Sequence, residues 1–537
     1  MHYNLLQVLI LLSVALMLMM LSRKFRLSYP LILVVAGLSC SYIPGIPTIT
    51  IDPELVLLIF LPPLLYEAAW YTSWNDFWKW KRAIGLLSFG LVIFTSVIVA
   101  VVSVALIPGF TLPMGFLLGG IISPPDAVAV TSVLKQMKIP KRVLTILEGE
   151  SLVNDASSLI VVRFALAAIL TGHFSAQQAS FSFLLVTIMG ICIGLAIGQI
   201  IYFIHRFLPT TASIDAAFTL MTPYFMYLCA EHFHCSGVMA VVSGGLFLSY
   251  RSHEIFTDGQ SRLQTTGVWA TLTIMLNGFI FLLMGLQLTT VMGGLKGHSL
   301  IEALGYALCI SLIVIFIRVI WVFPATFIPR ILFKSVREKE ASPGWKGPFI
   351  IAWSGMRGMV SLAAAMSLPV LNSAGEPLPG RSLIIFITFV VILITLVLQG
   401  LSLPFLIRKI NIPEIDPVIP ANQQELTVRL RLMEVALKIL DNKYLPETRQ
   451  NELLKSWRSE MHDDWKQSTE YLRSVEDHGA AQTGINEYNK IILEIYHAQR
   501  KELFQIRKER LISDNIIRNE EMLIALSEVK LAPYQNE

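Results

Sequence analysis

Charged residues are scarce in this sequence of 537 residues. They make up 15% of the chain, whereas hydrophobic residues make up 54% and the mean hydropathy is +0.62. Soluble globular proteins carry about 25% charged residues. The shortage excludes an ordinary water-soluble protein and predicts an all-α polytopic membrane protein.

Cysteine is also rare, and complete enzyme motifs are missing. The five cysteines lie in or beside apolar segments without a CxxC spacing, so no disulfide framework is predicted. "GESLV" lacks the second glycine of a nucleophile elbow. "SVLK" pairs Ser132 with Lys135, but Lys135 falls in a basic loop. We therefore expect no enzyme, and an intramembrane hydrolase built on this pair is the last alternative.

Acidic residues are few in the first 410 residues, which hold 16 of the 38 acids but 25 of the 42 bases. Residues 411–537 hold the other 22 acids and 17 bases. This shift predicts a transmembrane domain over 1–410 and a polar, helical cytosolic tail over 411–537, where "LRLMEVALKIL" alternates charged and apolar positions at helical spacing. Regulation, dimerisation, capping of the inner face and binding of a cytosolic regulator all stay open as roles of the tail.

Apolar stretches long enough to cross a bilayer as helices recur thirteen times along the first domain. The first has no charged leader before it and no clear cleavage site after it, so we interpret it as a retained helix. The expected spans are 5–22, 29–43, 52–70, 83–106, 113–134, 143–170, 181–203, 214–230, 236–250, 266–290, 300–328, 347–370 and 382–406.

Basic residues gather in every second loop between these spans. With the N-terminus outside, the inner loops hold 20 Lys and Arg residues and the outer loops hold two, Lys296 and Arg381. Cytoplasmic loops carry such an excess, so we expect the N-terminus outside and the C-terminus in the cytosol. Because topology explains the basic residues, the expected partner is membrane lipid and no nucleic acid is expected.

Ionisable residues also occur inside the apolar spans. Each costs at least about 2.5–3.5 kcal/mol there and usually marks an ion or proton path. They are candidates for a functional site: Glu67, Asp126, Glu150, Asp155, Arg318 and Arg357.

The stretch "LEGESLVNDASSLI" (147–160) places two of these carboxylates on one helix. With Glu150 set at 0° and about 100° per residue, Asn154 falls at about 40°, Ser158 at about 80°, Ser151 at about 100° and Asp155 at about 140°. The polar side chains thus share one face. That face is either an ion site or a stripe of interhelical hydrogen bonds.

Two spans contain residues that interrupt a helix. In "GGIISPPDAVAVTSVL" the adjacent Pro124 and Pro125 predict a break, with Asp126 capping the second half-helix and either contacting an ion there or not. In "AWSGMRGMVSLAAA" two glycines flank Arg357, the natural counter-charge for Glu150 or Asp126. Broken spans in corresponding positions predict inverted repeats with a site at the membrane midplane. Counted along the chain, helices 4–6 (the spans 83–106, 113–134 and 143–170) and helices 11–13 (300–328, 347–370 and 382–406) would form the two repeats.

Minor features leave alternatives open. "EHFHC" (231–235) is either a small metal-ligand cluster or an interfacial, pH-responsive histidine pair. Arg163 lies off the polar face of its helix and either contacts another helix or extends to the outer interface.

Four motifs carry a family resemblance: "LPPLLYEAAW", "SPPDAVAV", "GESLVNDASS" and "WSGMRGMVSLA", in this order. Together they resemble the sodium/proton exchangers of the monovalent cation:proton antiporter-1 family, in its bacterial NhaP-type branch. The resemblance implies a homodimer in the cell inner membrane. It also implies a dimerisation domain of helices 1–3 and 7–10, and a core of helices 4–6 and 11–13 that moves like an elevator.

The resemblance also implies roles for single residues. Asp155, the Ser151 hydroxyl and the Pro125 carbonyl would hold a monovalent cation, and Glu67 and Asp126 would contribute directly or through water. Asn154 would shape the site, Glu150 would pair with Arg357, and Arg318 would be a second structural charge. The chain departs from the family at Pro125-Asp126-Ala127, where Thr-Asp-Pro is usual, so a threonine hydroxyl is lost.

The expected mechanism needs no cofactor. A buried carboxylate holds either a proton or a cation, because burial disfavours its free charged form. Asp155 would exchange the two. Since position 154 is Asn, one titrating carboxylate predicts electroneutral exchange, with Na⁺ and Li⁺ as the first choice and K⁺/H⁺ antiport as the alternative. A cation channel or a membrane sensor that signals through the tail is the alternative from another class.

Overall fold

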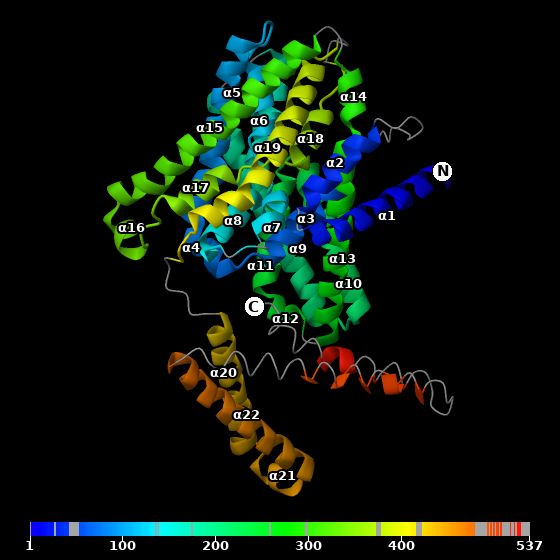
Figure 1. Ribbon diagram of the computed structural model, residues 1–537, viewed down its shortest axis with the longest axis vertical. Helices are drawn as coiled ribbons and strands as arrows, with labels where there is room; N and C mark the ends of the chain where they lie inside the picture. The colour runs from blue at the N-terminus through cyan, green and yellow to red at the C-terminus, as the bar shows by residue number, and fades with distance from the viewer. Residues whose placement is uncertain are drawn as a thin grey trace. The chain divides into compact units, whose positions relative to one another are not determined.

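The computed structural model of the chain is helical, apart from one antiparallel bridge between Leu371 and Pro377 among the residues it describes (Figure 1). Two compact units divide the chain, Met1–Asp416 and Pro417–Glu537. The described residues are 2–25, 28–41, 53–134, 137, 139–172, 176–256, 259–295, 299–371, 377–414 and 421–477, with scattered helical residues between 491 and 527.

One group of helices in the first unit is built around α13. This helix packs on α1, α2, α3 and α10, while α11 packs on α3, α9 and α10. Two short helices, α12 (Ser252–Ile255) and α14 (Leu288–Gly293), flank α13 in the chain. The long members are α1 (His2–Phe25), α2 (Tyr29–Ser41), α3 (Pro53–Tyr71), α9 (Ala176–Phe207), α10 (Ala212–His232), α11 (Gly237–Tyr250) and α13 (Gly259–Leu286).

The other group surrounds α8 and α19. Helix α8 packs on α4, α5, α6, α7 and α17, and α19 packs on α6, α7, α15, α17 and α18. A π-helical stretch, η1 (Leu86–Leu91), joins α4 to α5. The members are α4 (Trp74–Gly85), α5 (Val92–Leu106), α6 (Leu112–Ile122), α7 (Ala127–Leu134), α8 (Lys141–Thr171), α15 (Leu300–Leu332), α16 (Lys334–Lys339), α17 (Lys346–Trp353), α18 (Met359–Met366) and α19 (Arg381–Ile410).

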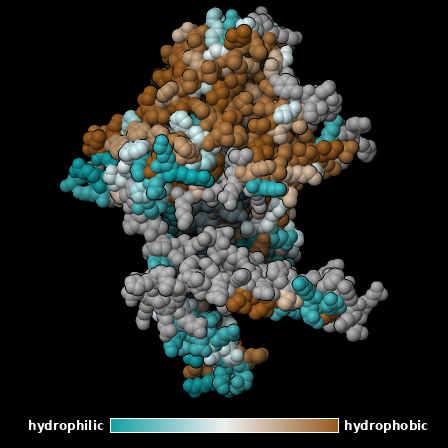
Figure 2. Space-filling model, in the orientation of Figure 1, coloured by the Kyte–Doolittle hydropathy of each residue, from teal (hydrophilic) through white to brown (hydrophobic). Residues whose placement is uncertain are grey.

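The first unit has the surface of a membrane protein. Large apolar side chains such as Met17, Ile301 and Phe316 are exposed on it, and Figure 2 shows hydrophobic residues over most of the visible face. Within the described residues, six helices are long and apolar enough to cross a membrane, and five shorter apolar helices accompany them. Each of the thirteen expected spans overlaps a helix or an interrupted pair of helices, while thirteen membrane crossings stay a prediction.

Two interruptions lie at the residues where the sequence analysis places them. Helix α6 ends at Ile122 and α7 begins at Ala127, and α17 ends at Trp353 before α18 begins at Met359. The two non-helical segments touch, because the Asp126 N–H donates to the Met356 carbonyl at 2.7 Å. Non-helical backbone at membrane depth has to be satisfied inside the protein, and this contact satisfies part of it.

The second unit contains helices with alternating charge. They are α20 (Ala421–Asn442), α21 (Leu445–Gln450) and α22 (Glu452–Asp477). Within this unit Arg458 of α22 binds Asp441 of α20 at 2.8 Å. A cytosolic location and a regulatory role of this unit stay predictions.

Candidate cation site

A cavity of about 520 Å³ lies between α3, α8, α13 and the two interruptions. Four acidic residues line it: Glu67 of α3, Asp126 of the first interruption, and Glu148 and Asp155 of α8. None of its described lining residues is Lys, Arg or His. A low-dielectric cavity lined by one sign of charge raises the local concentration of the opposite ion, so this cavity attracts cations.

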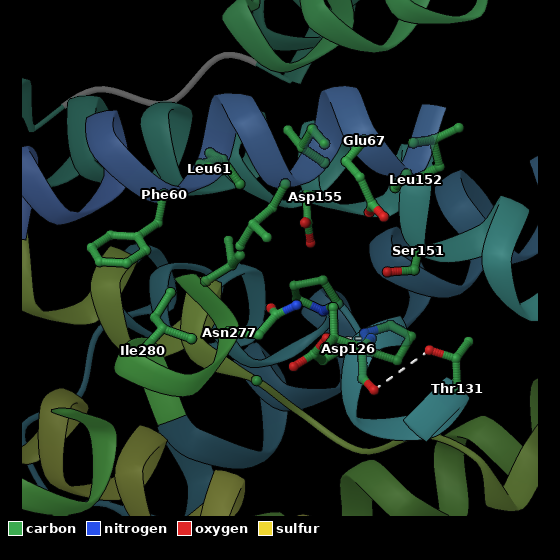
Figure 3. A pocket seen from close by; sticks show the side chains of 18 of the residues that line it. Phe60, Leu61, Glu67, Asp126, Thr131, Ser151, Leu152, Asp155, Asn277 and Ile280 are labelled. Atoms are coloured by element: carbon green, nitrogen blue, oxygen red, sulfur yellow. Dashed lines mark hydrogen bonds between the residues drawn. The ribbon is translucent and has the colours of Figure 1, made fainter. Parts of the chain in front are cut away.

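Asp155 and Ser151 face the cavity from one side of α8. They are four residues apart and therefore lie one above the other on the helix. Figure 3 shows their side chains pointing into the cavity beside Glu67 of α3. Asp155 is 8% exposed and has neither a hydrogen bond nor a salt bridge to any described residue. Its carboxylate oxygens are therefore available to a proton or a cation from the cavity.

Asp126 caps a helix, as the sequence predicts, and also lines the cavity. Its Oδ1 accepts from the Val128 N–H at 2.8 Å, so the carboxylate caps the first turn of α7. The positive end of the α7 dipole stabilises the negative charge there. Asp126 also lines the cavity, as Figure 3 shows, and its role as a cation ligand stays a prediction.

Asn154 holds the first interruption against α8. Its side chain is fully buried, and its Nδ2 donates to the Pro125 carbonyl at 3.0 Å. This carbonyl is the main-chain oxygen expected to bind the cation. Asn154 therefore orients a candidate ligand.

The expected pairing of Glu150 with Arg357 is wrong. Arg318 of α15 binds Glu150 with both terminal nitrogens, at 2.5 and 2.7 Å, and both side chains are fully buried. The Arg318 Nε also donates to the Ile351 carbonyl at 3.1 Å. The partner of Arg318, which the sequence did not predict, is thus Glu150. The two residues meet because α15 packs on α5, η1 and α17, which also pack on α8.

Arg357 instead binds main-chain carbonyls at the first interruption. Its Nε donates to the Ile122 carbonyl at 3.0 Å, and its terminal nitrogens contact the carbonyls of Ser123, at 3.5 Å, and Gly355. The last carbonyls of a helix lack intrahelical donors and carry partial negative charge. Arg357 therefore neutralises the C-terminal end of α6, while Asp126 caps the start of α7.

The polar face of α8 makes interhelical hydrogen bonds and also borders the cavity, while its use as an ion site stays a prediction. Ser158 donates to the Gly120 carbonyl of α6 at 2.8 Å, and Ser157 donates to the Ser88 carbonyl of η1 at 2.5 Å. Ser88 in turn donates to the Glu150 carbonyl at 3.0 Å. These hydroxyls connect helices, whereas Ser151 and Asp155 line the cavity.

Several polar residues that line the cavity were not candidates in the sequence analysis: Tyr71, Thr72, Thr131, Glu148, Asn277 and Ser361. Glu148 lies two turns before Asp155 on α8, and its helical position of about 160° would have placed it on the same face. Asn277 lines the cavity from α13. A single amide in an apolar helix has no periodic signal, so only the fold could reveal Asn277.

The minor features have local explanations. Ser132 donates to the Ala129 carbonyl of its own helix at 2.7 Å, and Lys135 lies outside the described residues. Arg163 contacts another helix, since its guanidinium binds Glu231 at the end of α10. The Glu231 of "EHFHC" is thereby engaged in an ion pair.

Comparisons with known proteins agree with this geometry. The family model described as "Sodium/hydrogen exchanger, transmembrane" matches residues 9–409. A sodium, potassium, lithium and rubidium/H(+) antiporter of Bacillus pumilus is 34% identical over 389 residues, which cover 71% of this chain and 58% of that protein. The Na(+)/H(+) antiporter ApNhaP of Aphanothece halophytica is 33% identical over 418 residues, covering 76% and 75%.

The fold is also that of a solved transporter. The sodium proton antiporter MjNhaP1 from Methanocaldococcus jannaschii superposes with a TM-score of 0.58 at 18% identity, covering 73% of this chain and 97% of that one. The family match spans most of the first unit, and the four motifs expected for such proteins contribute residues to one acidic cavity and the two interruptions beside it. The chain therefore belongs to the sodium/hydrogen exchanger family, in its NhaP-type branch of cation/proton antiporters.

Proposed function

We propose that the protein is an electroneutral Na⁺(Li⁺)/H⁺ antiporter in which the proton and the cation compete for Asp155. The observation that carries this proposal is the Asp155 carboxylate, which faces an acidic cavity without a hydrogen bond or salt bridge to any described residue. Ser151, Glu67 and Asp126 add further oxygen atoms to the same cavity. Oxygen donors of these kinds suit hard cations.

The proposed stoichiometry is one proton for one cation. Asn154, next to Asp155, cannot titrate, and its amide is bound to the Pro125 carbonyl. The charge of Glu150 is balanced by Arg318 in a buried pair. If a transit requires Asp155 to be neutralised by a proton or a cation, each cycle exchanges one for the other and moves no net charge.

Alternating access would use the two groups of helices. Three polar residues line the cavity close to helix ends: Tyr71 and Thr72 at the C-terminal end of α3, and Glu148 near the start of α8. With the N-terminus outside, these ends of α3 and α8 face the cytosol. We propose that the group around α8 and α19 moves like an elevator against the group around α13, which also forms the homodimer in the bacterial inner membrane.

Potassium is a second candidate for the transported cation. The Bacillus pumilus relative is named for four alkali cations, potassium among them. Position 125 is proline, so it supplies a carbonyl but no side-chain hydroxyl to the site. A site with fewer compact ligands discriminates less strongly against a larger ion.

Flux through purified protein tests the proposal. In proteoliposomes with an imposed pH gradient, added Na⁺ or Li⁺ is expected to dissipate the gradient, and the rate is expected not to change when the membrane potential is clamped. Comparison with K⁺ decides between the two ion preferences. Current that follows the membrane potential would instead indicate a channel, and no response to any alkali cation would overturn antiport.

Gly358 allows the two interruptions to approach each other. A Cβ atom at this position would lie 2.0 Å from Asp126 Oδ2. Gly358→Ala is therefore expected to displace the Asp126 carboxylate and to lower Na⁺-dependent exchange at least about tenfold, the effect of about 1.4 kcal/mol of binding free energy. Gly305→Ala on α15 is the matched control, because a Cβ there meets nothing within 4 Å. Equal rates in the two variants would contradict the expectation.

A further inference from the structure

Asn277 is a buried amide in the cavity that the proposed exchange does not use. It lies on α13 and is 6% exposed. No hydrogen bond joins its side chain to any described residue, including those that line the cavity. Figure 3 shows the amide pointing into the cavity between the apolar Ile280 and the acidic groups.

An amide in this position is costly unless it has a partner. Burying a polar group without a hydrogen bond is unfavourable, and buried amides in proteins are nearly always satisfied. The other residues of α13 that line the cavity are Ala270, Ile280 and Phe281, none of which carries a polar side chain. The polar atoms of Asn277 therefore point to a ligand in the cavity.

The cavity places Asn277 on the wall opposite the main cation-binding candidates. Asp155 and Ser151 belong to α8 in one group of helices, whereas Asn277 belongs to α13 in the other. Helix α13 packs on α3, which carries Glu67, and on α18, which follows the second interruption, and Glu67 and Gly358 line the same cavity. A cation beside Asp155 would have Asn277 on its far side.

The chemistry of an amide suits this place. Its carbonyl oxygen is a hard, neutral donor that adds a ligand to a cation without adding another negative charge. Pro125 brings no side-chain donor of its own to the site. Small cations such as Li⁺ and Na⁺ give up more hydration free energy on binding than K⁺ does, so they depend more on a complete shell of nearby oxygens. A neutral oxygen on the far wall therefore changes the preference among Li⁺, Na⁺ and K⁺.

We propose that Asn277 is a specificity-determining residue that completes the oxygen shell of the cation from α13. The inference rests on the proposed cation/proton exchange at Asp155. It assigns to Asn277 the apparent affinity and the preference among alkali cations, while Asp155 carries the proton.

Transport kinetics of the full chain in proteoliposomes test this proposal. Asn277→Leu keeps the size of the side chain and removes its oxygen. We expect the KM for Na⁺ to rise about tenfold, as for loss of one contact to a charged group, while the maximal rate changes less than about twofold. The KM for K⁺ should rise less. Asn277→Asp, which keeps an oxygen in place, should restore the KM for Na⁺.

A second measurement separates binding from folding. The rise in melting temperature on adding Na⁺ to detergent-solubilised protein should be smaller for Asn277→Leu than for wild type, because a ligand stabilises the state that binds it. If Asn277→Leu does not fold, Asn277→Thr keeps a shorter oxygen and is expected to give an intermediate KM. Thr271→Val, at an exposed position of the same helix, is the control.

The outcomes distinguish the inference from the proposed function. An unchanged KM ratio between Na⁺ and K⁺ in folded Asn277→Leu, or an equal fall in the maximal rate for every cation, would show a structural role and overturn the inference alone. Absence of cation-dependent exchange in the wild-type protein would overturn the proposed function and the inference with it.

Discussion

Asp155→Asn is expected to reduce Na⁺- and Li⁺-dependent proton exchange to the rate of protein-free liposomes. The amide has nearly the shape of the carboxylate but neither takes up a proton near neutral pH nor neutralises a cation. Because Asp155 has no hydrogen bond or salt bridge to a described residue, the substitution breaks no structural contact. It also removes a poorly solvated charge, so the melting temperature should stay the same or rise.

The matched control for Asp155→Asn is Glu302→Gln. Glu302 is exposed in the first turn of α15 and lies outside the cavity, so this neutralisation should leave exchange unchanged. Folded Asp155→Asn protein that exchanges at the wild-type rate would refute the central role of Asp155. A variant that loses activity only because it no longer folds would show a lower melting temperature than wild type.

Glu150→Gln is expected to destabilise the protein by about 3–5 kcal/mol, the cost of leaving one member of a buried ion pair without its partner. Arg318 would keep its charge in a fully buried position, where only neutral oxygens, those of the new amide and of the Ile351 carbonyl, could accept from it. Arg318→Gln likewise leaves the charge of Glu150 buried without an opposite charge beside it. The midpoint of thermal unfolding in detergent measures both effects.

The double variant Glu150→Gln/Arg318→Gln separates the pair from its surroundings. We expect it to be more stable than either single variant, because no buried charge is left alone. Glu434→Gln, which breaks an exposed pair with Lys438 on α20, should change the midpoint little. A double variant whose loss equals the sum of the single losses would mean that Glu150 and Arg318 do not act as a pair.

The interruptions of the two core helices could be predicted from local sequence. Pro124 and Pro125 lack N–H donors and cannot continue a helix, so the break between α6 and α7 follows from the residues themselves. Asp126 was expected to cap α7 for the same local reason, and its carboxylate does accept from the Val128 N–H. Most of the cavity carboxylates are also predictable, since a charge in an apolar span is visible in the sequence.

The partners of the buried arginines could not be predicted in the same way. Glu150 and Arg318 are 168 residues apart in the chain. Both a carboxylate and the carbonyls at a helix end can satisfy a guanidinium. Charge alone therefore does not show whether Arg318 or Arg357 pairs with Glu150. The choice depends on which helix packs beside α8 and on where α6 ends.

The sequence by itself determined the membrane class, the helix positions, the two interruptions and three of the four acidic residues that line the cavity. Those features follow from hydropathy, backbone chemistry and motifs, which act over a few residues. Only the tertiary structure decided that Arg318 neutralises Glu150, that Arg357 binds the end of α6, and that Asn277 and Glu148 join the cavity. Burial makes each of these contacts necessary, because a charge or amide removed from water must find a partner, and packing of distant helices selects which one.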